Sequence, residues 1–373
     1  MPMACGTMSR VRTLPIQTAS ATYNVLLGED LLPDLPQYLG DIFGQRPRRY
    51  FVVTSPEIWA LWSEVFLSGF AADGGPTVLL LPAGEHHKRL AALERLAQQL
   101  ATAGADRGSV LIAFGGGVIG DVTGFLAAIY MRGLDFIQVP TTLLAQVDSS
   151  VGGKTGVNLA AGKNLIGSFH HPRLVLADTA VLRSLPPAEV RAGLFESLKA
   201  GLIYDRALFE FIERSAETLL RQETEPLTHV IAESVRIKAC VVAQDEREAG
   251  LRMILNFGHT VGHAIEALTH YRGLLHGEAV GWGMRVAVEA SRKRGLPDAE
   301  ADRILTAIDA LGLPSLPRLT ARRLVNAAAG DKKRIGGIRH FVLLDGIGQA
   351  NVINDLSDDE LLQAIRRGLK LGR

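Results

Sequence analysis

The stretch that decides the fold is Ser109-Val-Leu-Ile-Ala-Phe-Gly-Gly-Gly-Val-Ile-Gly-Asp121. Its first half is a short apolar run, typical of a strand buried on both faces, and its second half is a glycine-rich turn that leads into a helical pattern. Similar apolar runs occur at residues 50–54, 77–81, 135–139 and 174–178, and helical patterns occur at residues 56–72, 88–103 and 118–131. Strands that alternate with helices predict a parallel sheet with helices on both sides.

The pattern changes after Pro186-Pro187, where almost every segment becomes helical. Helical patterns cover residues 188–203, 206–220, 226–243, 254–268 and 278–294, followed by a short strand at 340–344 and a closing helix at 358–369. We therefore predict an α/β nucleotide-binding domain over residues 1–185 and a mostly α-helical metal- and substrate-binding domain over residues 186–373.

The composition excludes several classes of protein. The 373 residues carry 40 basic and 39 acidic side chains, and this balance argues against a nucleic-acid binder, which usually needs a strongly basic face. No segment has the length and apolarity of a membrane span, and the first residues lack the apolar centre of a signal peptide. The two cysteines form no disulfide framework. We expect a cytoplasmic protein without nucleic-acid or membrane partners.

The glycine turn at residues 115–120 satisfies the pattern G-x-G-x-x-G. Glycines let the backbone approach a phosphate, and the start of the following helix supplies N–H donors and the positive end of the helix dipole. The turn departs from the usual dinucleotide fingerprint because it follows the third predicted strand of the sheet. A tight strand-to-helix turn without a ligand is the alternative, and the neighbouring motifs favour a phosphate site.

Two further segments carry basic and amide side chains between glycines. They are Asp148-Ser-Ser-Val-Gly-Gly-Lys154-Thr and Gly162-Lys-Asn-Leu-Ile-Gly167, and they follow Pro140-Thr-Thr142, which caps a predicted short helix. We interpret residues 148–167 as a long functional loop that binds an anion, with Arg132 just upstream. For any single lysine a solvated surface position is the favoured interpretation, and the same holds for Lys199, Lys238 and Arg252 in the helical half when each is taken alone.

A possible metal site lies in Asn256-Phe-Gly-His-Thr-Val-Gly-His263. His259 and His263 are four residues apart on a predicted helix, so both side chains point the same way. His276 opens the next helix, and Glu196 lies inside the first helix of this half. Two imidazoles and a carboxylate leave coordination positions open, as catalytic zinc sites do. The pair lacks the glutamate of H-E-x-x-H, which excludes a zinc protease. Core or capping histidines are the alternative.

Together these motifs resemble the 3-dehydroquinate synthase family from about residue 50 to residue 344. The segments that carry the resemblance are 115–121, 138–142, 148–154, 162–167, 252–263 and 275–278. The resemblance implies an NAD-binding enzyme with Zn2+ or Co2+ held by Glu196, His259 and His276. It implies NAD contacts from Gly84, Glu85, Lys88, Gly116, Gly117, Val118, Gly120, Asp121, Thr141, Thr142, Lys154, Lys163, Val181, Leu182, Arg183 and Ser184.

The resemblance also assigns residues to the substrate and to proton transfer. Substrate contacts are implied for Asp148, Lys154, Asn164, Lys199, Lys238, Arg252 and Asn256, and proton transfer for Glu248 and His263. Arg132 matches a phosphate contact that the family supplies from the neighbouring subunit, which implies a homodimer. One of Lys332 and Lys333 is implied to close over the substrate, and the sequence leaves open which one.

The implied activity is that of a lyase acting on 3-deoxy-D-arabino-heptulosonate 7-phosphate, a sugar-acid phosphate of the shikimate pathway for aromatic amino acid biosynthesis. In the proposed family mechanism, NAD+ takes a hydride from the C5 alcohol, and the resulting ketone acidifies the neighbouring C–H so that phosphate leaves by β-elimination. NADH then returns the hydride, the ring opens, and an intramolecular aldol reaction closes the carbocycle of 3-dehydroquinate. NAD is therefore recycled.

Some residues depart from the family pattern. Ala200 and Ala83 stand where the family often has Tyr and Asp, and Thr54-Ser55 lacks the acidic residue that would hold the adenosine ribose. Three rival functions share some of these motifs. They are a related sugar-phosphate cyclase with a valiolone or inosose product, a metal-dependent alcohol dehydrogenase, and a binding protein without activity. The lysine-, asparagine- and arginine-bearing motifs suit a substrate with a carboxylate and favour 3-dehydroquinate synthase.

Overall fold

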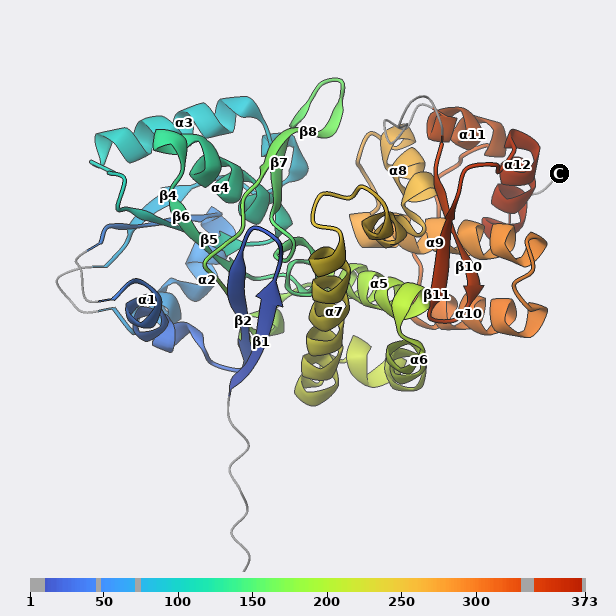
Figure 1. Cartoon of the computed structure of the whole chain (residues 1–373), viewed down its shortest axis with the longest axis horizontal. Helices are drawn as coiled ribbons and strands as arrows, with labels where there is room; N and C mark the ends of the chain where they lie inside the picture. Colours follow the sequence, from blue (N-terminus) through green and yellow to red (C-terminus); the bar gives the residue numbers. More distant parts are fainter. Residues whose placement is uncertain (1–10, 45–47, 71–74, 330–338, 371–373) are drawn as a thin grey trace, which may run out of the picture. The chain divides into compact units, whose positions relative to one another are not determined.

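The computed structural model describes residues 11–44, 48–70, 75–329 and 339–370 (Figure 1). The chain divides into two compact units, Met1–Leu185 and Pro186–Arg373. The first contains a largely parallel sheet with helices, and the second is mostly helical, so the predicted fold class is confirmed. Lys332 and Lys333 lie outside the described residues. No helix in the described ranges is long and apolar enough to cross a membrane.

The first unit is built on a seven-stranded sheet in the order β1-β2-β9-β6-β5-β3-β4. Its strands are β1 (Val11–Gln17), β2 (Thr22–Gly28), β3 (Tyr50–Thr54), β4 (Thr77–Leu80), β5 (Val110–Gly115), β6 (Asp135–Pro140) and β9 (Leu174–Asp178). All neighbouring pairs are parallel except β1 with β2. The β1–β2 hairpin was not predicted, because exposed polar side chains interrupt its apolar pattern.

Helices cover both faces of this sheet. Leu111 and Ala113 of β5 belong to the apolar core that includes α3 (Leu90–Thr102) and α4 (Gly117–Ile129). Phe114 of β5 points to the opposite face, because successive side chains of a strand alternate. There its ring centroid lies 4.7 Å from that of Phe66 in α2 (Pro56–Leu67). The strand buried on both faces, predicted from residues 109–114, is confirmed.

The interpretation of residues 148–167 as a long loop is wrong. The structure has a π-helical turn, η4 (Ala145–Ser149), followed by an antiparallel hairpin of β7 (Lys154–Leu159) and β8 (Gly162–Phe169). Glycines in both strands concealed the hairpin, because glycine is rare inside strands. Gly156 and Gly167 face each other in the register, where an added Cβ on either would meet the partner's backbone.

The second unit contains α5 (Pro187–Tyr204), α6 (Arg206–Leu220), α7 (Thr224–Gln244), α8 (His259–Leu268), α9 (His276–Lys293), α10 (Asp298–Ala310), α11 (Ala321–Ala329), α12 (Asp358–Gly368) and the hairpin of β10 (Phe341–Gly346) and β11 (Gln349–Ile353). The single helix predicted at residues 254–268 is wrong at its start. A short helix, η6 (Leu251–Asn256), is separated from α8 by Gly258, whose φ of +79° favours glycine. α10, α11, α1 (Leu35–Phe43) and β11 were not predicted.

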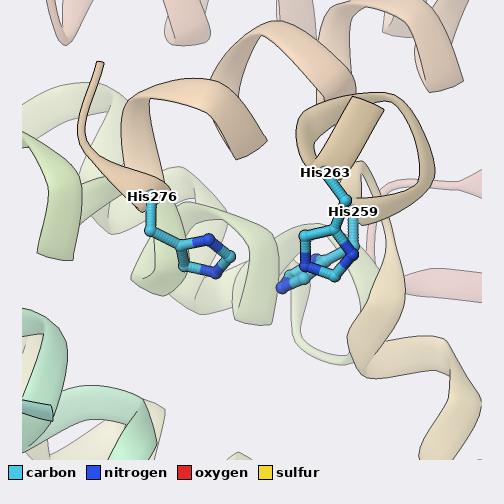
Figure 2. A group of neighbouring side chains, drawn as sticks. All are labelled: His259, His263 and His276. Carbon is cyan, nitrogen blue, oxygen red and sulfur yellow. The ribbon is translucent and has the colours of Figure 1, made fainter. Parts of the chain in front are cut away.

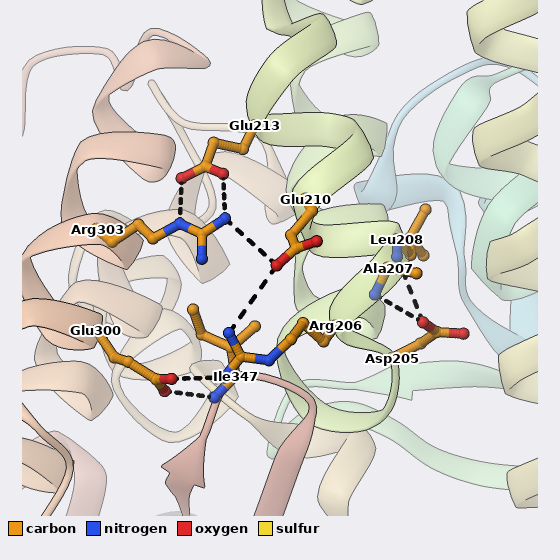
Figure 3. Close-up of polar contacts among 9 residues, drawn as sticks. All are labelled: Asp205, Arg206, Ala207, Leu208, Glu210, Glu213, Glu300, Arg303 and Ile347. Atoms are coloured by element: carbon orange, nitrogen blue, oxygen red, sulfur yellow. Dashed lines mark hydrogen bonds and ion pairs between the residues drawn. The ribbon is translucent and has the colours of Figure 1, made fainter.

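A surface network ties the β10–β11 turn to α6 and α10 (Figure 3). Glu300 pairs with Arg206 and accepts a hydrogen bond from the Ile347 backbone N–H at 2.9 Å. Arg303 makes a bidentate pair with Glu213, at 2.7 and 2.6 Å. Exposed ion pairs each contribute little to stability, about 0–1 kcal/mol. The backbone hydrogen bond gives the network its structural role, because it fixes the turn beside the start of α6.

Replacing Gly201 with alanine should destabilise the second unit. An added Cβ would lie 2.7 Å from the Phe209 backbone nitrogen and 3.0 Å from its Cα, so α5 and α6 would have to separate. We expect a loss of about 1–3 kcal/mol, as in other overpacked cores. Gly40 in α1 has nothing within 4 Å of an added Cβ, and its alanine variant should gain about 0.5–1 kcal/mol from helix propensity. Thermal unfolding of both variants tests the contrast, and equal shifts would contradict it.

Candidate active site

The glycine turn of the first unit lies directly at the start of α4. Gly116 is the N-cap residue and Gly117 the first helical residue, and among the described residues no side chain caps this end. An added Cβ on Gly116 would lie 3.0 Å from Thr142 Cγ2, and one on Gly117 would lie 3.1 Å from Ser149 Oγ. The glycines therefore let the turn pack closely against residues 142–149 and leave the first N–H groups of α4 available to an anion.

The position of this turn in the sheet also suits a nucleotide. β3 and β5 are neighbours in the sheet. The chain runs from β3 through α2 to β4, which pairs with the edge of β3 away from β5, and from β5 through α4 to β6, which pairs with the edge of β5 away from β3. Such a divergence of connections is the switch point at which open α/β sheets bind ligands, outside the carboxyl ends of the strands. The residues at these two strand ends are Thr54-Ser55 and Gly115-Gly116, so the predicted phosphate turn lies at the switch point.

A buried lysine organises the polar groups around this turn. Lys88 forms an ion pair with Asp121 in the second turn of α4, and its Nζ donates to Asn164 Oδ1 at 2.6 Å. Burial by itself would lower the pKa of Lys88, but the negative charges of Asp121 and Glu85 outweigh it and hold the pKa above its usual value. Lys88 therefore stays charged. The structure thus brings together four residues from three separate predicted segments.

Asn158 completes this network and was not predicted. Its side-chain nitrogen donates to Glu85 Oε1 at 2.7 Å, and its Oδ1 accepts from the Asn164 backbone N–H at 2.8 Å. Lys163 lies 3.9 Å from the same Glu85 oxygen. Asn158 is buried in β7, and the hairpin that places it there was interpreted as a loop, so the sequence held no signal for its role.

The remaining residues predicted to contact a nucleotide lie on two short segments of the first unit. Thr141 is buried, and Thr142 Oγ1 accepts from the Ala145 backbone N–H at 3.2 Å. The segment 181–184 belongs to a 3-10 helix, η5 (Thr179–Ser184). Ser184 Oγ accepts from Trp62 Nε1 at 3.0 Å, and Arg183 pairs with Glu29 at 2.6 Å.

The second unit brings three histidines together. His259 is the first residue of α8, His263 lies one turn later, and His276 is the first residue of α9. One ring nitrogen of each lies within 4.8 Å of the others, and Figure 2 shows the three rings gathered around one point. This clustering favours the metal interpretation over the alternative that His263 and His276 are core or capping histidines. The predicted helical spacing of four residues places His259 and His263 on one face.

Glu196 adds a carboxylate to this cluster. Its Oε1 lies 3.8 Å from His259 Nε2 and 3.7 Å from His276 Nε2, and its side chain is 1% exposed. This oxygen accepts no hydrogen bond from the described residues. Ligand atoms about 2.1 Å from one tetrahedral ion lie about 3.4 Å apart, so both distances are close to the spacing in the ligand shell of a metal such as zinc. A buried carboxylate oxygen beside two imidazole nitrogens has the donor set of a divalent metal site.

Both candidate ligand histidines have their other ring nitrogen engaged. His259 Nδ1 lies 3.2 Å from the Phe257 carbonyl oxygen, and His276 Nδ1 lies 3.3 Å from Glu266 Oε2. An acceptor at Nδ1 holds the proton there and leaves the Nε2 lone pair for a metal. Glu266 was missed by the sequence interpretation. A readable signal existed, because Glu266 follows His259 by seven residues and His263 by three on the same helix.

The basic residues predicted for the second unit are buried, so the interpretation of each, taken alone, as a solvated helix-face charge is wrong. Lys199, Lys238 and Arg252 are at most 8% exposed, and Lys199 pairs with Glu196 one turn away on α5. Three cations removed from water need anionic or dipolar partners. Asn256 Nδ2 donates to Glu248 Oε1 at 2.9 Å, so two further predicted residues lie side by side.

Asp245 holds the loop that carries Arg252. Its carboxylate accepts from the backbone N–H groups of Ala249 at 2.8 Å, Gly250 at 2.7 Å and Arg252 at 3.0 Å. Burial would raise the pKa of Asp245, but these hydrogen bonds outweigh it and hold the pKa below its usual value. The Arg252 guanidinium donates to the Glu246 carbonyl oxygen. The loop is therefore fixed by a charged cap that the sequence did not reveal.

The members of the predicted anion site that lie in the first unit are exposed or half-buried. Lys154 begins β7 and is exposed, Asn164 is exposed in β8, and Asp148 is half-buried in η4. Arg132 is exposed at the end of a short 3-10 helix. The φ angle is +69° at Arg132 and +48° at Met131. Left-handed backbone at a non-glycine residue is strained and often marks a functional position.

Two protein families match adjacent parts of the chain. Residues 78–192 match the family described as 3-dehydroquinate synthase N-terminal, and residues 193–334 match the family described as 3-dehydroquinate synthase C-terminal. The 3-dehydroquinate synthase of Solibacter usitatus is 46% identical over 357 residues, which cover 95% of this chain and 98% of that protein. The chain belongs to the 3-dehydroquinate synthase family.

Solved structures of related cyclases have the same fold. A 2-deoxy-scyllo-inosose synthase complexed with carbaglucose-6-phosphate, NAD+ and Co2+ superposes with a TM-score of 0.86 at 29% identity, over 96% of this chain and all of that chain. A 2-epi-5-epi-valiolone synthase from Streptomyces hygroscopicus with NAD+ and Zn2+ bound also gives a TM-score of 0.86 at 29% identity, over 94% of this chain and 98% of that chain. Enzymes with different products therefore share this framework.

Replacing Lys88 with methionine should destabilise the first unit, because Asp121 and Asn164 lose a buried donor. We expect a loss of about 1–3 kcal/mol, below the full cost of breaking a buried ion pair, because the Asp121 side chain is 21% exposed. Denaturant unfolding measures the change. Lys163→Met is the matched control, and its more distant pair with Glu85 should contribute no more than about 0.5 kcal/mol. A loss of the same size in both variants would show that Lys88 has no special role.

Proposed function

We propose that this chain is a lyase that converts 3-deoxy-D-arabino-heptulosonate 7-phosphate to 3-dehydroquinate and inorganic phosphate, with NAD and a divalent metal ion. The observation that carries the proposal is the cluster of Glu196, His259 and His276 with Lys199, in which the carboxylate and the ammonium group are buried. The chain is also 46% identical to the 3-dehydroquinate synthase of Solibacter usitatus over nearly its full length. The cluster offers a metal site, and the family membership names the reaction in which such a site would act.

NAD would be held by the first unit. The start of α4 can take the pyrophosphate, and the network of Lys88, Asp121 and Glu85 can fix the surrounding turn. Bound NAD would supply a transient hydride acceptor. Lys154, Lys163, Thr141, Thr142 and the segment 181–184 remain the other proposed contacts. At the carboxyl end of β3, Thr54 and Ser55 stand where an acidic residue would hold the adenosine ribose, and the buried Thr54 hydroxyl has no hydrogen-bond partner in the described structure.

A Zn2+ or Co2+ ion would be held by Glu196, His259 and His276. When bound, it would act as a Lewis acid that lowers the pKa of a coordinated alcohol and polarises a carbonyl. The protein contributes the orientation of the two imidazoles through their Nδ1 contacts, and it keeps Glu196 out of water. Three protein ligands leave positions open for substrate oxygens, as in other catalytic zinc sites.

The charged groups of the substrate require a cationic environment. Lys199, Lys238 and Arg252 are buried, and a phosphate or carboxylate at such groups makes stronger hydrogen bonds than it would in water. Asn256 adds an amide, and we assign Asp148, Lys154 and Asn164 of the first unit to the same substrate. Two buried lysines and a buried arginine favour a substrate with more than one anionic group.

Proton transfer is assigned to His263 and Glu248. His263 lies in the histidine cluster, with its ring centroid 5.3 Å from that of His259 and 5.8 Å from that of His276. Glu248 accepts from Asn256 and has a φ of +61°, a strained conformation for a glutamate. Both side chains therefore lie next to residues assigned to the metal and the substrate.

We infer that the protein is a homodimer in which Arg132 contacts the phosphate bound to the neighbouring subunit. The exposed side chain and the left-handed backbone at Arg132 support a role outside its own unit. The cytoplasmic location also remains a prediction from the sequence. Two rival products, valiolone and inosose compounds, belong to relatives only 29% identical, and this difference favours 3-dehydroquinate.

Purified protein given the proposed substrate, NAD+ and Zn2+ or Co2+ should release phosphate over many turnovers. NADH absorbance should show no net rise, because the hydride is returned in each cycle, and chelation should stop the reaction. A phosphate assay with parallel absorbance at the NADH band measures both. NADH accumulating in step with substrate would instead indicate a dehydrogenase. Phosphate released only from sedoheptulose 7-phosphate, or cyclisation of glucose 6-phosphate, would indicate a related cyclase.

The ligand assignment has its own test, because His263 lies close enough to be a ligand in place of Glu196. Glu196→Ala should weaken Zn2+ binding by about 100-fold or more, since it removes one of three proposed protein ligands. His263→Ala should keep the affinity within about 10-fold and mainly lower turnover. Equilibrium dialysis against a competing chelator measures the binding. If His263→Ala loses zinc and Glu196→Ala retains it, the metal is held by the three histidines instead.

A further inference from the structure

α8 carries two imidazoles and one carboxylate on the same face. His259, His263 and Glu266 are separated by four and three residues, which correspond to about one helical turn each, so they form a single row. The first two belong to the histidine cluster, whereas Glu266 lies outside the proposed ligand set. The Glu266 side chain is only 5% exposed, and glutamates are rarely so buried unless they are paired.

Glu266 contacts a residue of the next helix. Its Oε2 lies 3.3 Å from Nδ1 of His276, and the opposite ring nitrogen, Nε2, lies 3.7 Å from Glu196 Oε1. The imidazole of His276 is therefore placed between two buried carboxylates, one at each nitrogen. Only the Glu196 side belongs to the proposed ligand set.

We propose that Glu266 is a positioning residue that fixes the ring orientation and the tautomer of His276, so that Nδ1 carries the proton and Nε2 faces the metal. The inference rests on the proposed metal site. A carboxylate that accepts from the far nitrogen of a ligand histidine also makes the metal-bound nitrogen more basic. Glu266 would act through His276 and would touch neither the metal nor the substrate.

His276 needs such support more than His259 does. The His259 side chain is 11% exposed and its Nδ1 faces a backbone carbonyl of its own segment, so local packing already holds the ring. The His276 side chain is 33% exposed, and its Nδ1 contacts a side chain of another helix and not the backbone of its own segment. Without Glu266, the ring could rotate or shift its proton to Nε2, and either change would remove the lone pair from the metal side.

The Glu266 side chain is not needed for the hydrogen bonds that hold the end of α8. The end of α8 is held by the backbone of Glu266, whose carbonyl oxygen accepts from the Tyr271 N–H at 2.8 Å and from Thr269 Oγ1 at 3.1 Å. These bonds survive any substitution of the side chain. A variant at position 266 therefore tests the contact with His276 while the backbone hydrogen bonds at the end of the helix remain.

The test uses the full-length protein with Glu266→Ala, Glu266→Gln and the control Glu289→Gln, a buried glutamate on α9. Zn2+ alone is titrated against a competing chelator, and Co2+ is followed by its visible spectrum. We expect Glu266→Ala to weaken binding by about 10–100-fold, the size seen when such outer partners are lost. Glu266→Gln should stay within about threefold of wild type, because its amide oxygen can still accept from Nδ1. The control should not change.

The tautomer gives a second measurement that needs no metal. Nitrogen NMR of the metal-free protein should show the Nδ1–H form of His276 in the wild type and in Glu266→Gln, and a shift toward Nε2–H in Glu266→Ala. An Nε2–H form in the wild type would overturn the proposal even if Glu266→Ala does not fold. Unchanged zinc affinity together with an unchanged tautomer in Glu266→Ala would also overturn it. A wild type that binds no zinc at all would instead refute the proposed metal site.

Discussion

The ion pair and imidazole contacts of Glu196 are the constraint on which the second unit depends. α5 is buried along most of its length from Val190 to Ile203, and only Glu196 and Lys199 carry charge among its buried residues. Placing a carboxylate there costs several kcal/mol unless charged or polar partners surround it. Lys199 offsets part of this cost within the helix, and His259 and His276 approach from two other helices. A buried charge of this kind fixes where α8 and α9 must begin.

Backbone contacts make that approach possible. Gly277 follows His276, and a Cβ added to Gly277 would overlap the carbonyl oxygen of Ala192 in α5. Gly258 precedes His259, and a Cβ added to Gly283 of α9 would overlap the carbonyl oxygen of Gly258. Helices can come this close only where one partner lacks a side chain. The glycines beside the two histidines are therefore part of the site, because they set the distance between the helices that carry its ligands.

Features set by local pattern were predicted from the sequence, whereas features that depend on distant partners were missed. Buried strands such as residues 110–115 and the four-residue spacing of His259 and His263 are local, and both were confirmed. The hairpin of residues 154–169 was missed because its pairing, not its composition, makes it a hairpin. Burial of Lys199, Lys238 and Arg252 was equally invisible, since a helical lysine in a sequence cannot reveal what packs against it.

The two kinds of site residue are constrained to different degrees. Lys88 and Glu196 are buried with charged partners, so a change at either leaves an uncompensated charge inside the protein. Lys154 is exposed, and substitution of an exposed side chain usually costs the fold little. Cyclases with inosose and valiolone products keep this fold at 29% identity. An exposed residue can therefore change at little cost to the fold, whereas the buried charges of this chain are constrained by stability as well as by their proposed chemistry.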